Sequence, residues 1–235
     1  MARQAADLVL ADDDLATVIV AVGEGRRIYA NIRMFLRYGL AGGLAEVLVI
    51  LVGPFLGLLV PLGPGQILWI NMITHGVPGV AFGGEPMDPA VMRRPSPSPQ
   101  RSVLGDGLVA QIVWGGLLIG GVSLAAGLMA PESQMQTWVF LTLGLAQLGV
   151  ALAIRAPRAD LGWRARGLEA AVLIAVALQV LAVTWTPVWE LLGTHPITSE
   201  DALLLVVLSA IPGVTLAAQR KLASALNLSR VGRTA

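Results

Sequence analysis

The stretch GLVAQIVWGGLLIGGVSLAAGLM, residues 107–129, decides the fold class of this chain, because it contains no charged side chain. A helix rises about 1.5 Å per residue, so about 20 apolar residues cross the hydrocarbon core of a bilayer. The whole chain shares this character: 55% of its 235 residues are hydrophobic and only 13% are charged. An ordinary soluble domain has about 25% charged residues. The sequence therefore predicts a membrane protein.

Apolar blocks of similar length lie on both sides of this stretch. Lipid offers no hydrogen bonds to the backbone, so such blocks should be helices, and the short alternating segments of a β-barrel are not seen. We predict an all-α membrane protein with six transmembrane helices, at about residues 34–59, 66–82, 107–129, 137–154, 168–188 and 202–218. These helices imply that the chain is embedded in a lipid bilayer, which is therefore an expected partner.

The basic residues indicate the orientation of these spans. Of the 16 Lys and Arg residues, 15 fall before the first span, between the second and third, between the fourth and fifth, or after the sixth, and Arg37 lies in the first turn of the first span, at the same end. The positive-inside rule then places both termini in the cytoplasm, in a multi-pass protein of the cell (plasma) membrane. The net charge of +1 and the lack of a basic run do not favour a nucleic-acid partner. The chain has no cysteine, which excludes disulfides and thiolate metal sites.

Two segments flank the predicted transmembrane domain of residues 34–218. Apolar residues recur at helical spacing over residues 15–38 but alternate with Glu24 and four arginines. This pattern is typical of a stalk helix that enters the first span from the cytoplasm, so residues 1–33 are predicted to be a cytoplasmic stub and stalk. Residues 219–235 are predicted to be a cytoplasmic tail.

Glu46 is the acidic residue that lies deep inside a predicted span. A carboxylate at such depth costs on the order of 2.5–3.5 kcal/mol, so it is a functional candidate by default. The alternative is a protonated Glu that bonds to a neighbouring helix for structural reasons.

The second span combines polar side chains with helix-breaking residues. Pro78 has no N–H and clashes with the carbonyl one turn earlier, while Gly76 and Gly79 remove support at the same place. We predict a broken helix whose freed carbonyls lie beside Asn71, Thr74 and His75, as in transporters that coordinate ions. The alternative is a simple proline kink with structural hydrogen bonds.

Several motifs resemble the P-type cation pumps of the calcium and sodium–potassium type. The resemblance begins with AADLVLADD at residues 5–13, continues through Glu24-Gly25-Arg26 and Phe35-Leu36-Arg37-Tyr38, and includes LWIN at 68–71 and THGVP at 74–78. Glu85-Pro86 and Met92-Arg93-Arg94-Pro95 follow it. The resemblance implies that the six spans are the family's fifth to tenth helices, preceded by the end of the phosphorylation domain.

The same resemblance implies a set of cation ligands. Glu46 matches the cation-ligand Glu of the family's fifth helix, and Asn71 and Thr74 match ligands of the broken sixth helix. Gln147 falls where some calcium pumps have a Glu. Together with His75, these residues form the predicted cation site.

Two departures from the family pattern leave the transported ion open. Gly43 stands where calcium pumps have a ligand Asn, and His75 stands where they usually have an Asp. A site with one carboxylate offsets less of the charge of a dehydrated divalent ion. A neutral His suits a softer metal or a proton carrier.

The parts of the family that use ATP have no match in this chain. Its Asp-Lys-Thr-Gly-Thr phosphorylation motif and its Thr-Gly-Glu loop do not occur in the sequence. The family uses ATP and Mg²⁺, but this chain is expected to bind neither and to hydrolyse no ATP alone. Its expected function is cation translocation as the C-terminal membrane part of a pump, as a split subunit with a separate N-terminal half or as a truncated remnant. The alternatives are a regulatory membrane partner of a full-length pump and an independent proton-coupled transporter.

Overall fold

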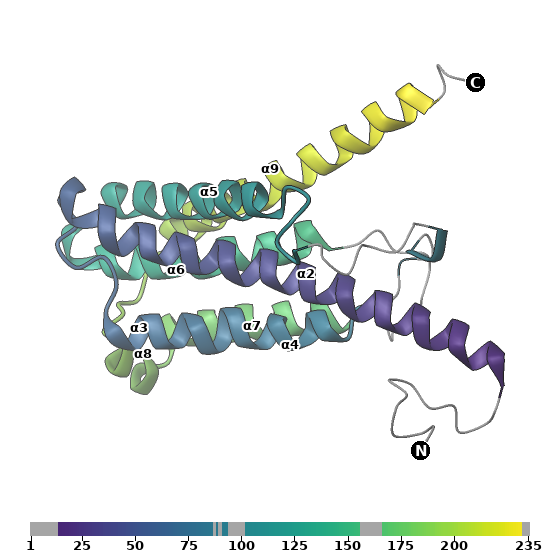
Figure 1. Ribbon diagram of the computed structural model, residues 1–235. Coiled ribbons are helices and arrows are strands. Elements are labelled where there is room, and N and C mark those ends of the chain that lie inside the picture. The colour runs from purple at the N-terminus through teal and green to yellow at the C-terminus, as the bar shows by residue number, and fades with distance from the viewer. Residues whose placement is uncertain (1–13, 87, 89–90, 94–101, 156–165, 232–235) are drawn as a thin grey trace.

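The computed structural model (Figure 1) describes residues 14–86, 88, 91–93, 102–155 and 166–231, and within these ranges the secondary structure is helical with no strand. The predicted stub at residues 1–13 and most of the proline-rich connection after Glu85 lie outside the described residues. The longer helices are α2 (Leu15–Val52), α5 (Leu108–Met129), α6 (Met135–Ile154), α7 (Gly167–Thr184) and α9 (Ser199–Val231).

Five helices in the described part of the chain are long and apolar enough to cross a membrane, and they are α2, α5, α6, α7 and α9. This confirms an all-helical, multi-pass membrane protein but does not confirm six spans. The predicted second span is helical from Pro64 to Gly83, but it consists of three consecutive short segments: α3 (Pro64–Trp69), the π-helix η2 (Ile70–Gly76) and α4 (Val77–Gly83).

The predicted stalk and the predicted first span form one continuous helix, α2. The Asp14 side chain caps its N-terminus by accepting a hydrogen bond of 2.8 Å from the backbone N–H of Ala16. Near its other end, α2 gives way to a 3₁₀ turn, Gly53–Leu56, in which Pro54 prevents the α-helical pattern from continuing. α9 also exceeds its prediction, because it continues past residue 218 to Val231. α2 begins and α9 ends beyond the same end of the bundle (Figure 1).

Short elements occupy the opposite end of the bundle. A short helix, α8 (Thr186–Leu192), follows α7 and lies beside α3 (Figure 1). Gln66 joins the two, because its side-chain amide donates to the carbonyl of Leu192 at 3.2 Å. The 3₁₀ turn η4 (Glu132–Gln134) connects α5 to α6.

Helix α6 forms the centre of the bundle. Its side chains from Thr137 to Leu143 are all buried, and it packs against α5, α7 and α9. Small residues allow close approach: a Cβ on Gly213 of α9 would lie 2.9 Å from the backbone of Gly149. Packing on small residues is the usual way in which membrane helices associate, because lipid supplies no hydrophobic drive between them.

A buried ion pair closes the bundle at the end where α6 finishes. Arg155 contacts the Glu85 carboxylate with hydrogen bonds of 2.7 and 2.8 Å, and it also pairs with Glu169 at the start of α7. The backbone carbonyl of Glu85 accepts hydrogen bonds from Arg27 and Asn31 of α2. This network therefore ties the segment after α4 to α2, α6 and α7.

Candidate functional site

Glu46 lies on α2 and is buried, with 6% of its surface exposed. Its carboxylate faces the π-helical segment, where the Asn71 amide donates to Glu46 Oε2 at 3.1 Å. The same Asn71 amide lies 2.9 Å from the carbonyl of Ile67. The acidic side chain that the sequence places deep inside a span thus accepts a hydrogen bond from a second helix.

The predicted helix break is wrong in form, because the chain stays helical through Gly76, Pro78 and Gly79. It widens into a π-helix before Pro78, and Pro78 then occupies the first turn of α4, where a missing N–H is tolerated. Pro78 has no N–H that could donate a hydrogen bond to the carbonyl of Thr74 four residues earlier. The hydroxyl of Tyr38 on α2 donates to that carbonyl instead. A local π adjustment and a neighbouring side chain therefore replace the unwound segment.

His75 lies beside both Glu46 and Asn71. Its Nδ1 is 3.5 Å from Glu46 Oε1 and 3.3 Å from Asn71 Oδ1. The Tyr38 ring contacts the imidazole edge-on, with the ring centroids 5.9 Å apart. The structure therefore brings three of the predicted site residues into one cluster.

Thr74 and Gln147 form a second polar contact next to this cluster. The Thr74 hydroxyl lies 2.9 Å from Gln147 Oε1 and 2.8 Å from the carbonyl of Ile70. Both side chains are fully buried, and Gln147 comes from the central helix α6. All five predicted site residues thus come from three packed elements, α2, η2 and α6.

Several buried polar atoms of this site have no hydrogen-bond partner among the described residues. They include Glu46 Oε1, His75 Nε2 and Gln147 Nε2. An unmade hydrogen bond in a buried site costs about 1–3 kcal/mol per group. Three such atoms in one place are therefore a reason to expect a ligand there, because buried polar groups are otherwise almost always paired.

Two residues of the site could not be recognised from the polar residues of the sequence. Gly42 leaves room for the imidazole, since a Cβ on Gly42 would lie 2.1 Å from His75 Nε2 and 3.2 Å from Gln147 Cδ. Tyr38 supplies the hydroxyl for Thr74. Their spacing could have indicated them, because Tyr38, Gly42 and Glu46 are four residues apart and therefore lie on one face of a helix.

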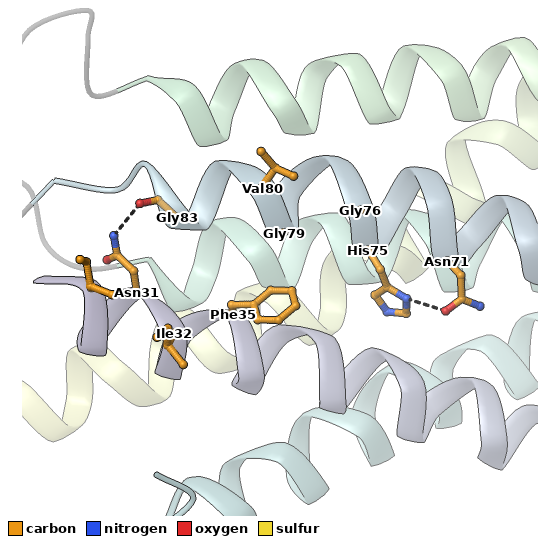
Figure 2. A pocket seen from close by; sticks show the side chains of 10 residues that line it. Asn31, Ile32, Phe35, Asn71, His75, Gly76, Gly79, Val80 and Gly83 are labelled. Atoms are coloured by element: carbon orange, nitrogen blue, oxygen red, sulfur yellow. Dashed lines mark hydrogen bonds between the residues drawn. The ribbon is translucent and has the colours of Figure 1, made fainter.

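A cavity of about 560 Å³ reaches the site from the side of the stalk (Figure 2). Its walls are apolar side chains of α2 and backbone and side chains of η2 and α4. Asn71 and His75 line one end, and Asn31, which donates to the carbonyl of Gly83 at 3.2 Å, lines the other (Figure 2). The polar cluster is therefore accessible along α2.

Other buried amides are satisfied and have a structural role. Gln179 accepts from the Trp69 indole at 3.2 Å and donates to the carbonyl of Phe140 at 3.2 Å. Within the described ranges, no three His, Cys, Asp or Glu side chains form a group that could hold a metal. Any cation at Glu46 would therefore need the amide and hydroxyl oxygens of its neighbours as well.

Comparisons with known proteins agree with the motifs. The family model described as "Cation transporting ATPase, C-terminus" matches residues 59–222. A calcium-transporting ATPase of Bacillus subtilis is 37% identical over 226 residues, which cover 92% of this chain and 25% of the relative. Calcium-transporting ATPase 1 of Bacillus cereus is 30% identical over 90% of this chain and 27% of its own length. Calcium-transporting ATPase 1 of Yarrowia lipolytica is 31% identical over 89% of this chain and 24% of its own.

The chain thus spans about a quarter of the length of these curated relatives. The matched part includes all five site residues, since Glu46 and Gln147 both lie far from the ends of the chain. The buried Glu46 carboxylate and the polar π-helix that faces it therefore lie in the part of the chain that matches these cation-transporting relatives. The chain belongs to the P-type cation-transporting ATPase family, and it corresponds to the C-terminal membrane part of these proteins.

Proposed function

We propose that this chain forms part of the cation pathway of an ATP-driven pump, with the cation bound beside Glu46. The observation that carries the proposal is the buried Glu46 carboxylate, which faces the polar side chains of η2 and has one oxygen without a hydrogen-bond partner among the described residues. A buried ionisable group inside a membrane is costly, so a function that needs the charge explains its presence. The π-helix places Asn71 and His75 toward the same carboxylate.

The proposal includes six membrane crossings. Residues 64–83 form twenty consecutive helical residues, which span about 30 Å, the thickness of the hydrocarbon core. In Figure 1, α4 runs side by side with α7, and both η2 and α4 pack against α7, as a crossing helix would. Six crossings place both termini on the side of the basic residues, which is the cytoplasmic side of the plasma membrane.

The energy for transport would come from parts that correspond to the remaining three quarters of the relatives. The sequence described here has no phosphorylation motif, so ATP and Mg²⁺ would bind outside it. The apolar side chains on the outer face of α2 support a contact with such parts. Ile28, Ile32 and Phe35 line the cavity and are 43–47% exposed. We infer that an N-terminal pump half, in the same or a separate polypeptide, packs against this face.

Co-expression with the N-terminal three quarters of the Bacillus subtilis relative tests the proposal. The assay is cation-dependent ATP hydrolysis by the purified complex. Glu46→Gln should lower this activity at least about tenfold, because Gln keeps the shape of the side chain but removes its charge. The matched control is Glu190→Gln on α8, where the same substitution falls on an exposed residue. Full activity of the Glu46→Gln complex would show that the site is wrong.

One distance favours a second candidate function, an independent proton-coupled transporter. Glu46 and His75 lie 3.5 Å apart and could exchange a proton. In that case the chain alone, reconstituted in vesicles, would move a substrate in response to a pH gradient. Transport that requires ATP and the N-terminal half would exclude this second candidate.

A further inference from the structure

His75 brings a ring nitrogen to the Glu46 site, whose other candidate ligands are oxygens. Its Nδ1 lies 3.5 Å from Glu46 Oε1 and 3.3 Å from Asn71 Oδ1. The Asn71 oxygen can only accept, and Glu46 Oε1 makes no hydrogen bond among the described residues. His75 Nδ1 therefore donates to these oxygens in the tautomer that is protonated at this atom, and in the other tautomer its lone pair can bind a cation together with them.

The spacing of these atoms suits a bound cation. Two neighbouring ligands of one divalent ion, each bound at about 2.0–2.5 Å, lie about 3–3.5 Å from each other. The two separations at His75 Nδ1 fall in or near this range. The spacing alone does not choose between ions, so the choice depends on the kinds of ligand atoms.

The ligand set favours a transition metal over calcium. Ca²⁺ takes about 6–8 oxygen ligands, several of them carboxylates, whereas an imidazole nitrogen suits first-row ions such as Fe²⁺, Co²⁺ and Zn²⁺. Glu46 is the one carboxylate of the cluster. Gly43, one turn before it on the same helix, adds no donor, and a Cβ there would meet no atom within 4 Å. The chain has no cysteine, so ions that need thiolates are not favoured.

We propose that the Glu46 site binds first-row divalent transition-metal ions in preference to Ca²⁺, with His75 as a nitrogen ligand. Glu46 Oε1 and Asn71 Oδ1 supply the accompanying oxygens. This inference rests on the proposed function, because it names the class of ion for the same site.

The two histidines of the chain permit a direct test. The full chain, labelled with ¹⁵N in its histidine rings and held in lipid nanodiscs, is titrated with Co²⁺ alone and with Ca²⁺ alone while its ring signals are followed by NMR. Co²⁺ should shift or broaden the His75 signals at concentrations at least about tenfold below any Ca²⁺ effect, and added Zn²⁺ should displace Co²⁺. His195 is exposed in the segment after α8, so His195→Ala should bind Co²⁺ as the unmodified chain does.

Variants separate the failure of this inference from the failure of the proposed site. His75→Gln should weaken Co²⁺ binding at least about tenfold, and His75→Asp should reverse the preference in favour of Ca²⁺. Tighter binding of Ca²⁺ than of Co²⁺, or Co²⁺ binding that survives His75→Gln, would overturn the inference. If such binding were still lost in Glu46→Gln, the proposed cation site would stand. If no divalent ion bound in a way that depends on Glu46, either to the chain alone or to its complex with the N-terminal pump half, both would be overturned.

Discussion

Gly42→Ala offers a sharp test of the site geometry. The new Cβ would lie 2.1 Å from His75 Nε2 and 3.1 Å from His75 Cδ2, closer than any normal contact. The ring cannot move freely, because Tyr38 contacts it edge-on and Glu46 and Asn71 lie at its Nδ1. Overpacking of this kind costs about 1–3 kcal/mol. Replacement of a helical Gly by Ala stabilises the helix by roughly 0.5–1 kcal/mol, so Gly42→Ala should lower the free energy of unfolding by about 1 kcal/mol in total.

The adjacent Gly43 is a matched control for this substitution. A Cβ on Gly43 would meet nothing within 4 Å, so Gly43→Ala should leave stability unchanged or raise it by up to about 1 kcal/mol. Thermal unfolding of the purified variants measures the difference, since 1 kcal/mol shifts the Tm of a chain of this size by about 2–4 °C. The double variant Gly42→Ala with His75→Ala should regain the loss, because the clashing ring is gone. Equal stability of the two glycine variants, or purely additive effects, would refute the geometry.

Three further predictions concern the rest of the chain. Glu85→Ala should lower the free energy of unfolding by about 3 kcal/mol, because it removes one partner of a buried ion pair, whereas Glu190→Ala on the exposed face of α8 should have little effect. Burial lowers the pKa of Arg155, but its hydrogen bonds to Glu85 and Glu169 outweigh this effect and raise the pKa above its ordinary value. Arg155 should therefore stay charged, and the stabilisation by its ion pairs, followed as the free energy of unfolding at rising pH, should not be lost up to about pH 11. The chain has no cysteine, so single cysteines can be introduced at the exposed positions Ser133, His195 and Ser102. Those at 133 and 195 should react with an impermeant thiol reagent from outside the cell, and the one at 102 should not. Labelling of the cysteine at position 102 in intact cells would contradict the proposed topology.

Much of the fold could be predicted from the sequence, because long charge-free blocks leave little choice in lipid. The prediction of residues 107–129 agrees with α5, Leu108–Met129, and that of residues 137–154 with α6, Met135–Ile154. The segments that differ are those with competing signals. α9 continues past its last apolar block because nothing in the sequence after residue 218 stops a helix before Val231. The predicted fifth span ends early, at Thr184, because Pro187 begins the separate turn of α8.

The candidate site residues could be named from the sequence, but their contacts could not. Glu46, Asn71 and Thr74 could be named because polar side chains are rare at such depth. The hydrogen bond from Tyr38 to the carbonyl of Thr74 in the π-helix could not, because Tyr38 comes from another helix. The Glu85–Arg155 pair joins residues far apart in the chain, and no local pattern relates them.

The single negative charge of the site indicates that a divalent ion would need a second acidic side chain from outside these residues. A divalent ion beside Glu46 would carry one positive charge more than the single carboxylate offsets, and an uncompensated charge in a membrane interior costs several kcal/mol. The described cluster has no second acidic side chain, since His75, Asn71, Thr74 and Gln147 bring only neutral or basic groups. The cavity along α2 ends at Asn71 and His75, so it offers a route by which a further carboxylate could approach the cation. We therefore expect tight binding of a divalent ion only when another element places an acidic side chain there, and weak binding to the chain alone. The substitution Val80→Glu, on the wall of the same cavity, tests this reasoning, because it should strengthen Co²⁺ binding to the isolated chain if charge limits affinity, whereas Val80→Gln should not.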